Sequence, residues 1–254
     1  PGVIPNLLIT GSGAPTGILV YEGDLLPEPF RGQMIHAEPG RNVVWAFPAR
    51  QVGAGYQASI TNLVHSQKDR NYRPSDISVA PDGSLIIADW FDPVDCCHRT
   101  VNDAGRIFRV APPKHAYSTP DFDFKTAAGA AKALRNPNLS VRYKAWTALQ
   151  AMQEKARPAL TNMAADQNPR FRARALWALA AIKDGAQKAI ELALKDEDDN
   201  LRALALRIAR RHAMPIEPLV RRLVRDESAL VRRECAVSLH RVATPEAVSY
   251  THLR

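Results

Sequence analysis

The sequence predicts a multidomain chain with a β part and an α part: two to three blades of a β-propeller, followed by an α-helical solenoid. Residues 1–115 are rich in Gly, Pro and β-forming residues, whereas the sequence from position 126 onward is rich in Ala, Leu and Arg and repeats at a regular interval. The charge changes too, because residues 1–125 carry 11 Lys and Arg against 13 Asp and Glu, and residues 126–254 carry 23 against 13. We therefore expect the C-terminal blades of a propeller in 1–115, a linker in 116–125 and helical repeats in 126–247.

The clearest β-unit lies in residues 71–110. The runs 77–79 and 85–87 alternate apolar with small or polar residues, which is typical of half-buried strands. Between them, Asp82-Gly83 favours the positive φ angles of a tight hairpin turn. A third strand at 106–110 completes the kind of antiparallel unit that propellers repeat around an axis.

Possible ligands crowd the loop after the second of these strands. They are Asp89, Asp92, Asp95, Cys96, Cys97 and His98. Carboxylates at a strand end suit Ca²⁺, which takes oxygen ligands, so Asp89 and Asp92 are candidate metal ligands. His98 is a candidate base or metal ligand. The alternative is that Asp92 begins a turn and Asp89 binds backbone N–H groups, and both interpretations stay open.

The neighbouring cysteines allow two states. Cys96 and Cys97 form either a strained vicinal disulfide or two free thiols. The attachment pattern C-x-x-C-H is absent, so we expect no c-type haem in this chain.

The second part repeats with a period of about 30 residues, a spacing typical of solenoids. An apolar residue followed by Arg recurs in register at Val141-Arg142, Phe171-Arg172, Leu201-Arg202 and Val231-Arg232. Ahead of each pair, at a constant offset, stands Asn136, Asp166, Asp196 or Asp226. Apolar side chains four and eight positions after the apolar residue of each dipeptide lie on one helical face. Two helices alone cannot bury that face, so successive pairs of helices must stack. The pattern resembles short HEAT-like repeats.

The recurring Arg has two interpretations. It either bonds the Asp and carbonyl groups of neighbouring repeats or lines a basic track for an anionic partner. The register shared with the Asn and Asp positions favours the first. Further arginines, at 207, 210, 211, 221, 222 and 225, are less easily explained in this way, although no aromatic residues interleave with them to stack on bases.

The first part resembles two families. Pro15-Thr16-Gly17, Tyr21-Glu22-Gly23-Asp24 and Arg31-Gly32 are similar to a segment of glucose/sorbosone dehydrogenase-type propellers. The next segment, with Arg73-Pro74-Ser75-Asp76, Pro81-Asp82-Gly83 and the run 88–93, is similar to large bacterial membrane-bound dehydrogenases of planctomycete type. In those proteins a propeller precedes HEAT repeats and often a c-type haem domain.

The resemblance implies an exported, periplasmic quinoprotein-like dehydrogenase acting on sugars or related alcohols, with pyrroloquinoline quinone and Ca²⁺ as cofactors of the parent protein. It makes Arg73, Asp76, Asp89, His98 and Arg99 candidate cofactor-binding residues, with Arg73 pairing either an anionic quinone or, as we expect, Asp76. The family's catalytic His base and haem domain would lie outside this chain. We therefore expect an internal fragment that is inactive alone, with no identifiable catalytic residue.

A second hypothesis is a non-catalytic binding scaffold. Its basic solenoid would dock a protein partner, an electron-acceptor haem domain or an anionic polymer such as nucleic acid or acidic glycan. No apolar run is long enough for a transmembrane segment. Residues 248–254 break the expected fifth repeat, and we expect this tail to be non-native sequence.

Overall fold

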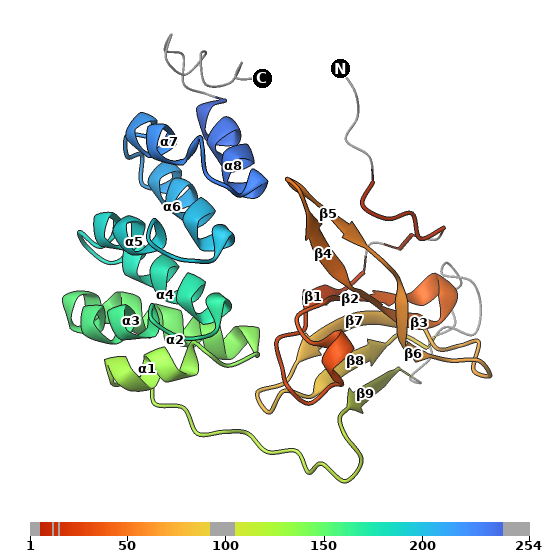
Figure 1. Ribbon diagram of the computed structural model, residues 1–254. Coiled ribbons are helices and arrows are strands. Elements are labelled where there is room, and N and C mark those ends of the chain that lie inside the picture. Colours follow the sequence, from red (N-terminus) through yellow and green to blue (C-terminus); the bar gives the residue numbers. More distant parts are fainter. Residues whose placement is uncertain (1–5, 12, 15, 92–104, 241–254) are drawn as a thin grey trace. The chain divides into compact units, whose positions relative to one another are not determined.

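The computed structural model (Figure 1) describes residues 6–11, 13–14, 16–91 and 105–240. It divides into two compact units. The first contains residues 1–51, 56–121 and 136–141, and the second contains residues 52–55, 122–135 and 142–254. The first is built of strands and the second of helices, as the composition predicts.

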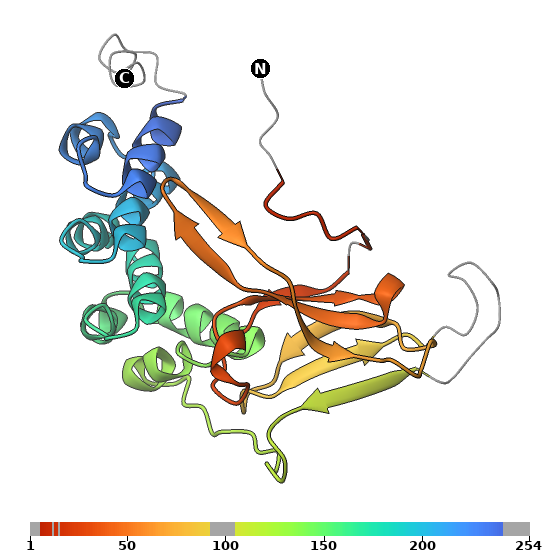
Figure 2. The ribbon, with the colours of Figure 1, turned by 45° about the vertical axis from the view of Figure 1, so that its right-hand side comes forward.

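The β-rich unit contains two main antiparallel sheets. The first has four strands in the order β1 (Ile18–Val20), β2 (Met34–Glu38), β3 (Val43–Phe47) and β6 (Thr61–His65). The second has three strands in the order β7 (Pro74–Val79), β8 (Leu85–Asp89) and β9 (Arg106–Val110). Strands β4 (Ala49–Val52) and β5 (Gly55–Ala58), which lie between β3 and β6 in the sequence, pair only with each other. Figure 2 shows them as a two-stranded hairpin that extends from the first sheet. Two short 3₁₀ turns, η1 (Glu28–Phe30) and η2 (Pro39–Arg41), complete the unit.

One hydrophobic core joins the two sheets. Side chains of β2 and β3, such as Ile35 and Val44, pack with Ile77 of β7 and Leu85 and Ile87 of β8, and all five are buried. At its edge the Tyr21 hydroxyl donates to Gly83 O at 2.7 Å and accepts from Leu25 N and Leu26 N at 3.2 and 3.1 Å. In a propeller, sheets of this kind repeat around a closed ring. The described strands, however, close neither a barrel nor a propeller ring.

The predicted hairpin is confirmed, with a correction to its turn. Val79 pairs with Leu85, and Ala80 N donates to Ser84 O at 2.8 Å, so three residues form the loop. Of the Asp-Gly pair, Gly83 alone has a positive φ, +90°. This is the three-residue hairpin loop, in which one left-handed residue after a type I turn is sufficient.

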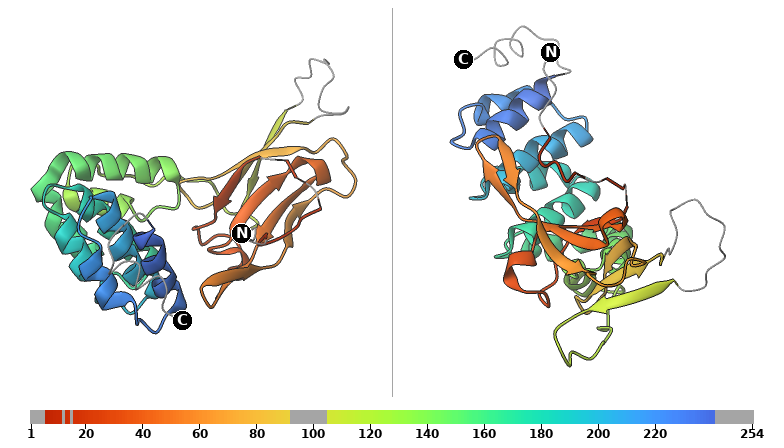
Figure 3. Two further views of the ribbon diagram at one scale, coloured as in Figure 1. Left: turned by 90° about the horizontal axis from the view of Figure 1, so that it is seen from above. Right: turned by 90° about the vertical axis from the view of Figure 1, so that its right-hand side faces the viewer.

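The helical unit contains short and long helices in alternation. The short ones are α1 (Ala127–Ala133), α3 (Arg157–Met163), α5 (Ala186–Ala193) and α7 (Glu217–Leu223). The long ones are α2 (Leu139–Met152), α4 (Pro169–Ala181), α6 (Asp199–Arg211) and α8 (Ala229–Leu239), and a 3₁₀ turn η3 (Gln153–Ala156) precedes α3. Each long helix starts one sequence period after the one before it, as the repeat predicts, and Figure 3 shows the pairs stacked in chain order.

Capping explains where the long helices begin. The side chains of Asn168, Asp198 and Ser228 each accept a hydrogen bond from the backbone N–H two residues later, at the starts of α4, α6 and α8. These residues satisfy N–H groups that the first helical turn leaves unpaired. Pro158 and Pro218 lie in the first turns of α3 and α7, where a missing N–H costs little.

Candidate functional site

Asp89, the central residue of the predicted ligand loop, is held inside the β-rich unit. It ends β8, and the strand register places it opposite Arg106 of β9. Its Oδ1 accepts from Arg73 N at 2.7 Å and from Phe91 N at 2.9 Å. Its Oδ2 accepts from Arg106 Nε at 2.7 Å and lies 2.6 Å from Arg106 Nη2. The Asp89 side chain is 0% exposed, so these four contacts balance its buried charge.

This arrangement does not suit a calcium ion at Asp89. Each carboxylate oxygen already has two donors, and a cation would have to displace the Arg106 guanidinium. Over residues 6–91 and 105–240, apart from positions 12 and 15, no three His, Cys, Asp or Glu side chains are grouped as a metal site requires. The geometry of Asp89 matches the alternative interpretation, in which its carboxylate binds backbone N–H groups. Asp92 lies outside the described residues.

The other predicted cofactor residues are only partly brought together. Arg73 lies next to Asp89 through its backbone N–H, but its Nη1 donates to Pro39 O at 3.0 Å. The expected Arg73–Asp76 pair is therefore wrong: Asp76 is exposed and its Oδ1 accepts from Ile77 N at 2.8 Å. His98 and Arg99 lie outside the described residues, as do Asp95, Cys96 and Cys97.

The recurring Arg residues of the helical unit are structural. Arg172 Nε and Nη2 reach the two carboxylate oxygens of Asp196 at 2.9 and 2.8 Å, and Arg202 reaches Asp226 at 2.8 and 2.9 Å. In both, Nη1 also donates to two carbonyls of the loop before its own helix. The hydrogen bond from Arg202 is the main reason that the pKa of Asp226 lies below its ordinary value. Arg172 and Arg202 therefore tie their repeats to the next ones, and Asp196 and Asp226 compensate their charges.

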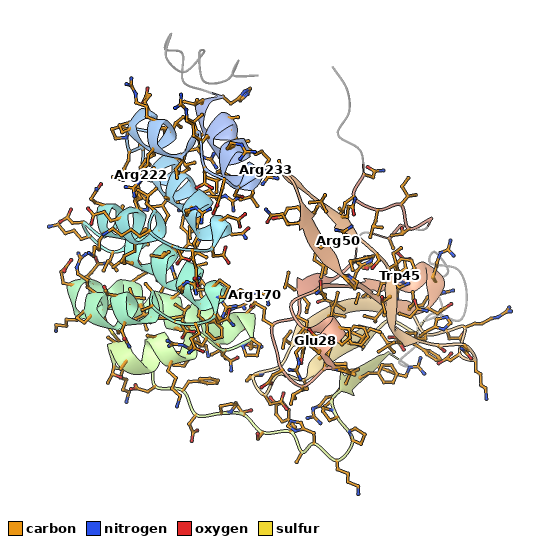
Figure 4. The ribbon with its side chains drawn as sticks, viewed as in Figure 1. Glu28, Trp45, Arg50, Arg170, Arg222 and Arg233 are labelled. Atoms are coloured by element: carbon orange, nitrogen blue, oxygen red, sulfur yellow. The ribbon has the colours of Figure 1, made fainter. Side chains whose placement is uncertain are left out.

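Five of the six additional arginines fall into two groups, and the sixth is Arg211. Arg207 Nη2 and Arg210 Nη2 lie 2.9 and 2.7 Å from the carboxylate of the buried Glu234, so their charges are largely compensated. Arg221, Arg222 and Arg225, by contrast, are exposed on or just after α7, and Figure 4 labels Arg222 there. None of the three lines the cavity of the long helices, to which Arg211 belongs.

A groove on the long helices combines aromatic and cationic side chains. Trp146 of α2, Trp177 and Ala181 of α4, and Arg211 and His212 at the end of α6 line a cavity of about 280 Å³. Trp146 is 40% exposed, and Trp177 is half-buried. The groove therefore presents indole surface and a positive charge together.

This groove is not visible as aromatic residues beside arginines along the chain. The aromatic and basic residues approach each other across repeats instead. Trp177 follows Trp146 by one repeat period plus one residue, so the two tryptophans occupy neighbouring positions in successive repeats. Ala181 and Arg211 are one repeat period apart and therefore share one register. Folding the sequence onto its repeat period would have placed them together.

The properties of the helices and the matches to known protein families limit how these sites can be interpreted. None of the described helices has the length and apolar character that crossing a bilayer requires.

No curated protein matches the chain. Residues 9–114 match the family model of a domain of unknown function (DUF7133), and residues 127–193 and 186–250 match the model of HEAT repeats. These matches say nothing of a dehydrogenase or of a planctomycete origin, but they agree with the helix pairs: the helical unit is a solenoid of HEAT repeats, a repeat type that generally mediates protein interactions.

Proposed function

We propose that this chain is a binding scaffold whose solenoid holds an acidic segment of a partner protein, with one large apolar side chain of that segment in the Trp146–Trp177 groove. The observation that carries the proposal is the pairing of exposed indole surface with Arg211 in one cavity. Trp and Arg are the residues that most often dominate the energy of protein interfaces.

The charge of the groove selects the partner. Among the described residues Arg211 has no carboxylate partner, whereas Arg207 and Arg210 share Glu234. An uncompensated guanidinium at the rim of an apolar cavity favours a carboxylate on the ligand, because a charge-assisted hydrogen bond of this kind is strong and directional. The cavity volume of about 280 Å³ lies at the lower end of small-molecule sites, so it suits one side chain better than a large cofactor.

Peptide display against the whole chain tests this proposal. We expect selected peptides to carry Trp, Phe or Leu flanked by Asp or Glu. Fluorescence polarisation of a selected, labelled peptide then compares Arg211→Glu with Arg225→Glu, which makes the same charge change on an exposed residue outside the groove. We expect R211E to weaken binding at least tenfold and R225E less than twofold. Trp146→Ala should weaken binding about thirtyfold, the effect of an interface hot spot.

Two results would overturn the proposal. One is the selection of no acidic-apolar peptide. The other is an equal effect of R211E and R225E, together with binding of duplex DNA or heparin that falls steeply with salt, because this would show an anionic polymer recognised by charge alone.

The quinoprotein-like parent protein remains a separate prediction that rests on the resemblance of the first part. It includes the quinone and calcium cofactors, export to the periplasm and electron transfer to a haem domain docked on the solenoid. Calorimetric titration of the chain with pyrroloquinoline quinone, with and without CaCl₂, tests its cofactor component. Calcium-dependent quinone binding would support it, and the absence of heat in both titrations would count against it.

A further inference from the structure

The four-stranded sheet of the β-rich unit carries a cavity on the face that points away from the shared core. Val44 and Ala46 of β3 belong to that core, so the alternating residues Val43 and Trp45 lie on the opposite face. The cavity there has a volume of about 400 Å³, which is within the range of small-molecule sites. Its lining residues are Arg41, Val43, Trp45, Asn62 and His65, and Figure 4 labels Trp45.

A β-bulge in β6 brings two polar side chains to this face. In the pairing of β3 with β6, Trp45 lies opposite Asn62. Val43 lies opposite His65, and Leu63 is the extra residue between the two pairs. In a regular strand, side chains three positions apart point to opposite faces. Because Leu63 packs against the core instead, Asn62 and His65 both line the cavity, and bulges commonly re-aim side chains in this way beside functional sites.

Arg41 supplies the positive charge of the cavity. It ends the 3₁₀ turn η2, and its Nη2 donates to Gly11 O at 2.9 Å. A guanidinium has five N–H donors, so this bond holds the group and leaves donors for a ligand. The Asn62 amide and a ring N–H of His65 add further donors. All three side chains are exposed, so a molecule in solution reaches their polar atoms.

No negative charge of the described chain balances these donors. None of the lining residues is acidic, and no ion pair within the described residues involves Arg41 or His65. Val43 and Trp45, at 2% and 6% exposure, form an apolar floor below the polar rim. Donors gathered around a guanidinium favour an oxyanion, because charge-assisted hydrogen bonds to carboxylate or phosphate are the strong ones.

We propose that this cavity binds a small molecule through a carboxylate or phosphate group, which accepts hydrogen bonds from Arg41, Asn62 and His65. The rest of the molecule lies over the apolar floor. The proposal concerns only the β-rich unit and is independent of peptide binding by the solenoid.

The test uses the whole chain and three probes that share one ring: benzoate, phenyl phosphate and benzyl alcohol. Saturation-transfer NMR at millimolar concentration should detect both anions, in mutual competition, and bind benzyl alcohol at least tenfold more weakly. The tighter of the two anions identifies whether the natural ligand carries a carboxylate or a phosphate.

Two variants, each with a matched control, assign the binding to this cavity. Arg41→Gln should weaken both anions at least tenfold, whereas Arg50→Gln, which removes an exposed charge of β4 outside the cavity, should weaken them less than twofold. Asn62→Asp keeps the shape of the side chain but adds a negative charge, so it should also weaken both anions at least tenfold. Its control Gln57→Glu makes the same charge change on exposed β5 and should have less than a twofold effect. Circular dichroism checks that each variant is folded.

Three results would overturn the proposal. The first is binding of benzyl alcohol as tight as that of the anions, since the donors would then contribute nothing. The second is an equal loss in R41Q and R50Q, which would show attraction by net charge alone. The third is the absence of binding by both anions.

Discussion

Replacing Arg202 with Met removes a largely buried link between two HEAT repeats. The Arg202 and Asp226 side chains are 13% and 9% exposed, and the guanidinium makes two hydrogen bonds to the carboxylate. It also donates to the carbonyls of Asp196 and Glu197 at 3.2 and 2.8 Å. The variant keeps an apolar stem but leaves a largely buried carboxylate without its counter-charge. Breaking a buried ion pair in this way costs about 3–5 kcal/mol.

The size of the effect can be measured by urea unfolding of the whole chain, followed by circular dichroism at the helical wavelength. With a slope of about 2 kcal/mol per molar urea, a loss of about 3 kcal/mol lowers the helical midpoint by roughly 1.5 M. Arg232→Met is the matched control, because Arg232 has the same register but is exposed and donates to the carbonyls of Asp226 and Glu227. We expect its midpoint to fall by about 0.5 M, for about 1 kcal/mol. Equal shifts for the two variants would refute the argument that buried charge pairing ties the repeats together.

The remaining predictions concern pH and a buried hydroxyl. Hydrogen bonding to Arg202 lowers the folded pKa of Asp226 below its unfolded value, so this stabilisation is present above the unfolded pKa, about 4, and is lost as pH falls through the folded pKa. Asp226→Asn should therefore make helical stability depend less on pH in that window, and an unchanged pH profile would contradict the assignment. Tyr21→Phe removes a fully buried hydroxyl with three partners, so we expect a loss of about 2–3 kcal/mol in thermal unfolding followed by near-UV circular dichroism, and Tyr56→Phe should have almost no effect.

The two tyrosines Tyr21 and Tyr72 show why burial alone does not give function. Both have raised pKa values because burial disfavours their charged forms. The Tyr21 hydroxyl is fully used by Gly83, Leu25 and Leu26, whereas that of Tyr72 is unused. Burial of a tyrosine therefore does not by itself tell whether its hydroxyl is hydrogen-bonded.

The sequence by itself determined the features of this protein that depend on short stretches of chain. The repeat period placed the starts of the long helices, because each start combines a capping side chain with an apolar face of helical spacing. Alternation of apolar residues placed β7 and β8, and the position of the turn followed from Gly83. The partners of Arg172 and Arg202 were predictable as well, since the Asp positions share their period.

Only the tertiary structure decided how the charged and aromatic residues are used. Asp89 looked like a metal ligand from its neighbours in sequence, but the pairing of β8 with β9 places Arg106 opposite it and occupies its carboxylate. The Trp146–Trp177 groove requires three helices from successive repeats, and a cavity lined by Tyr72 and Phe108 requires β6 and β9, which come from different sheets. Periodicity reports which face of an element is buried, but the side chains that meet there depend on strand register and helix stacking, which bring together residues far apart in the chain.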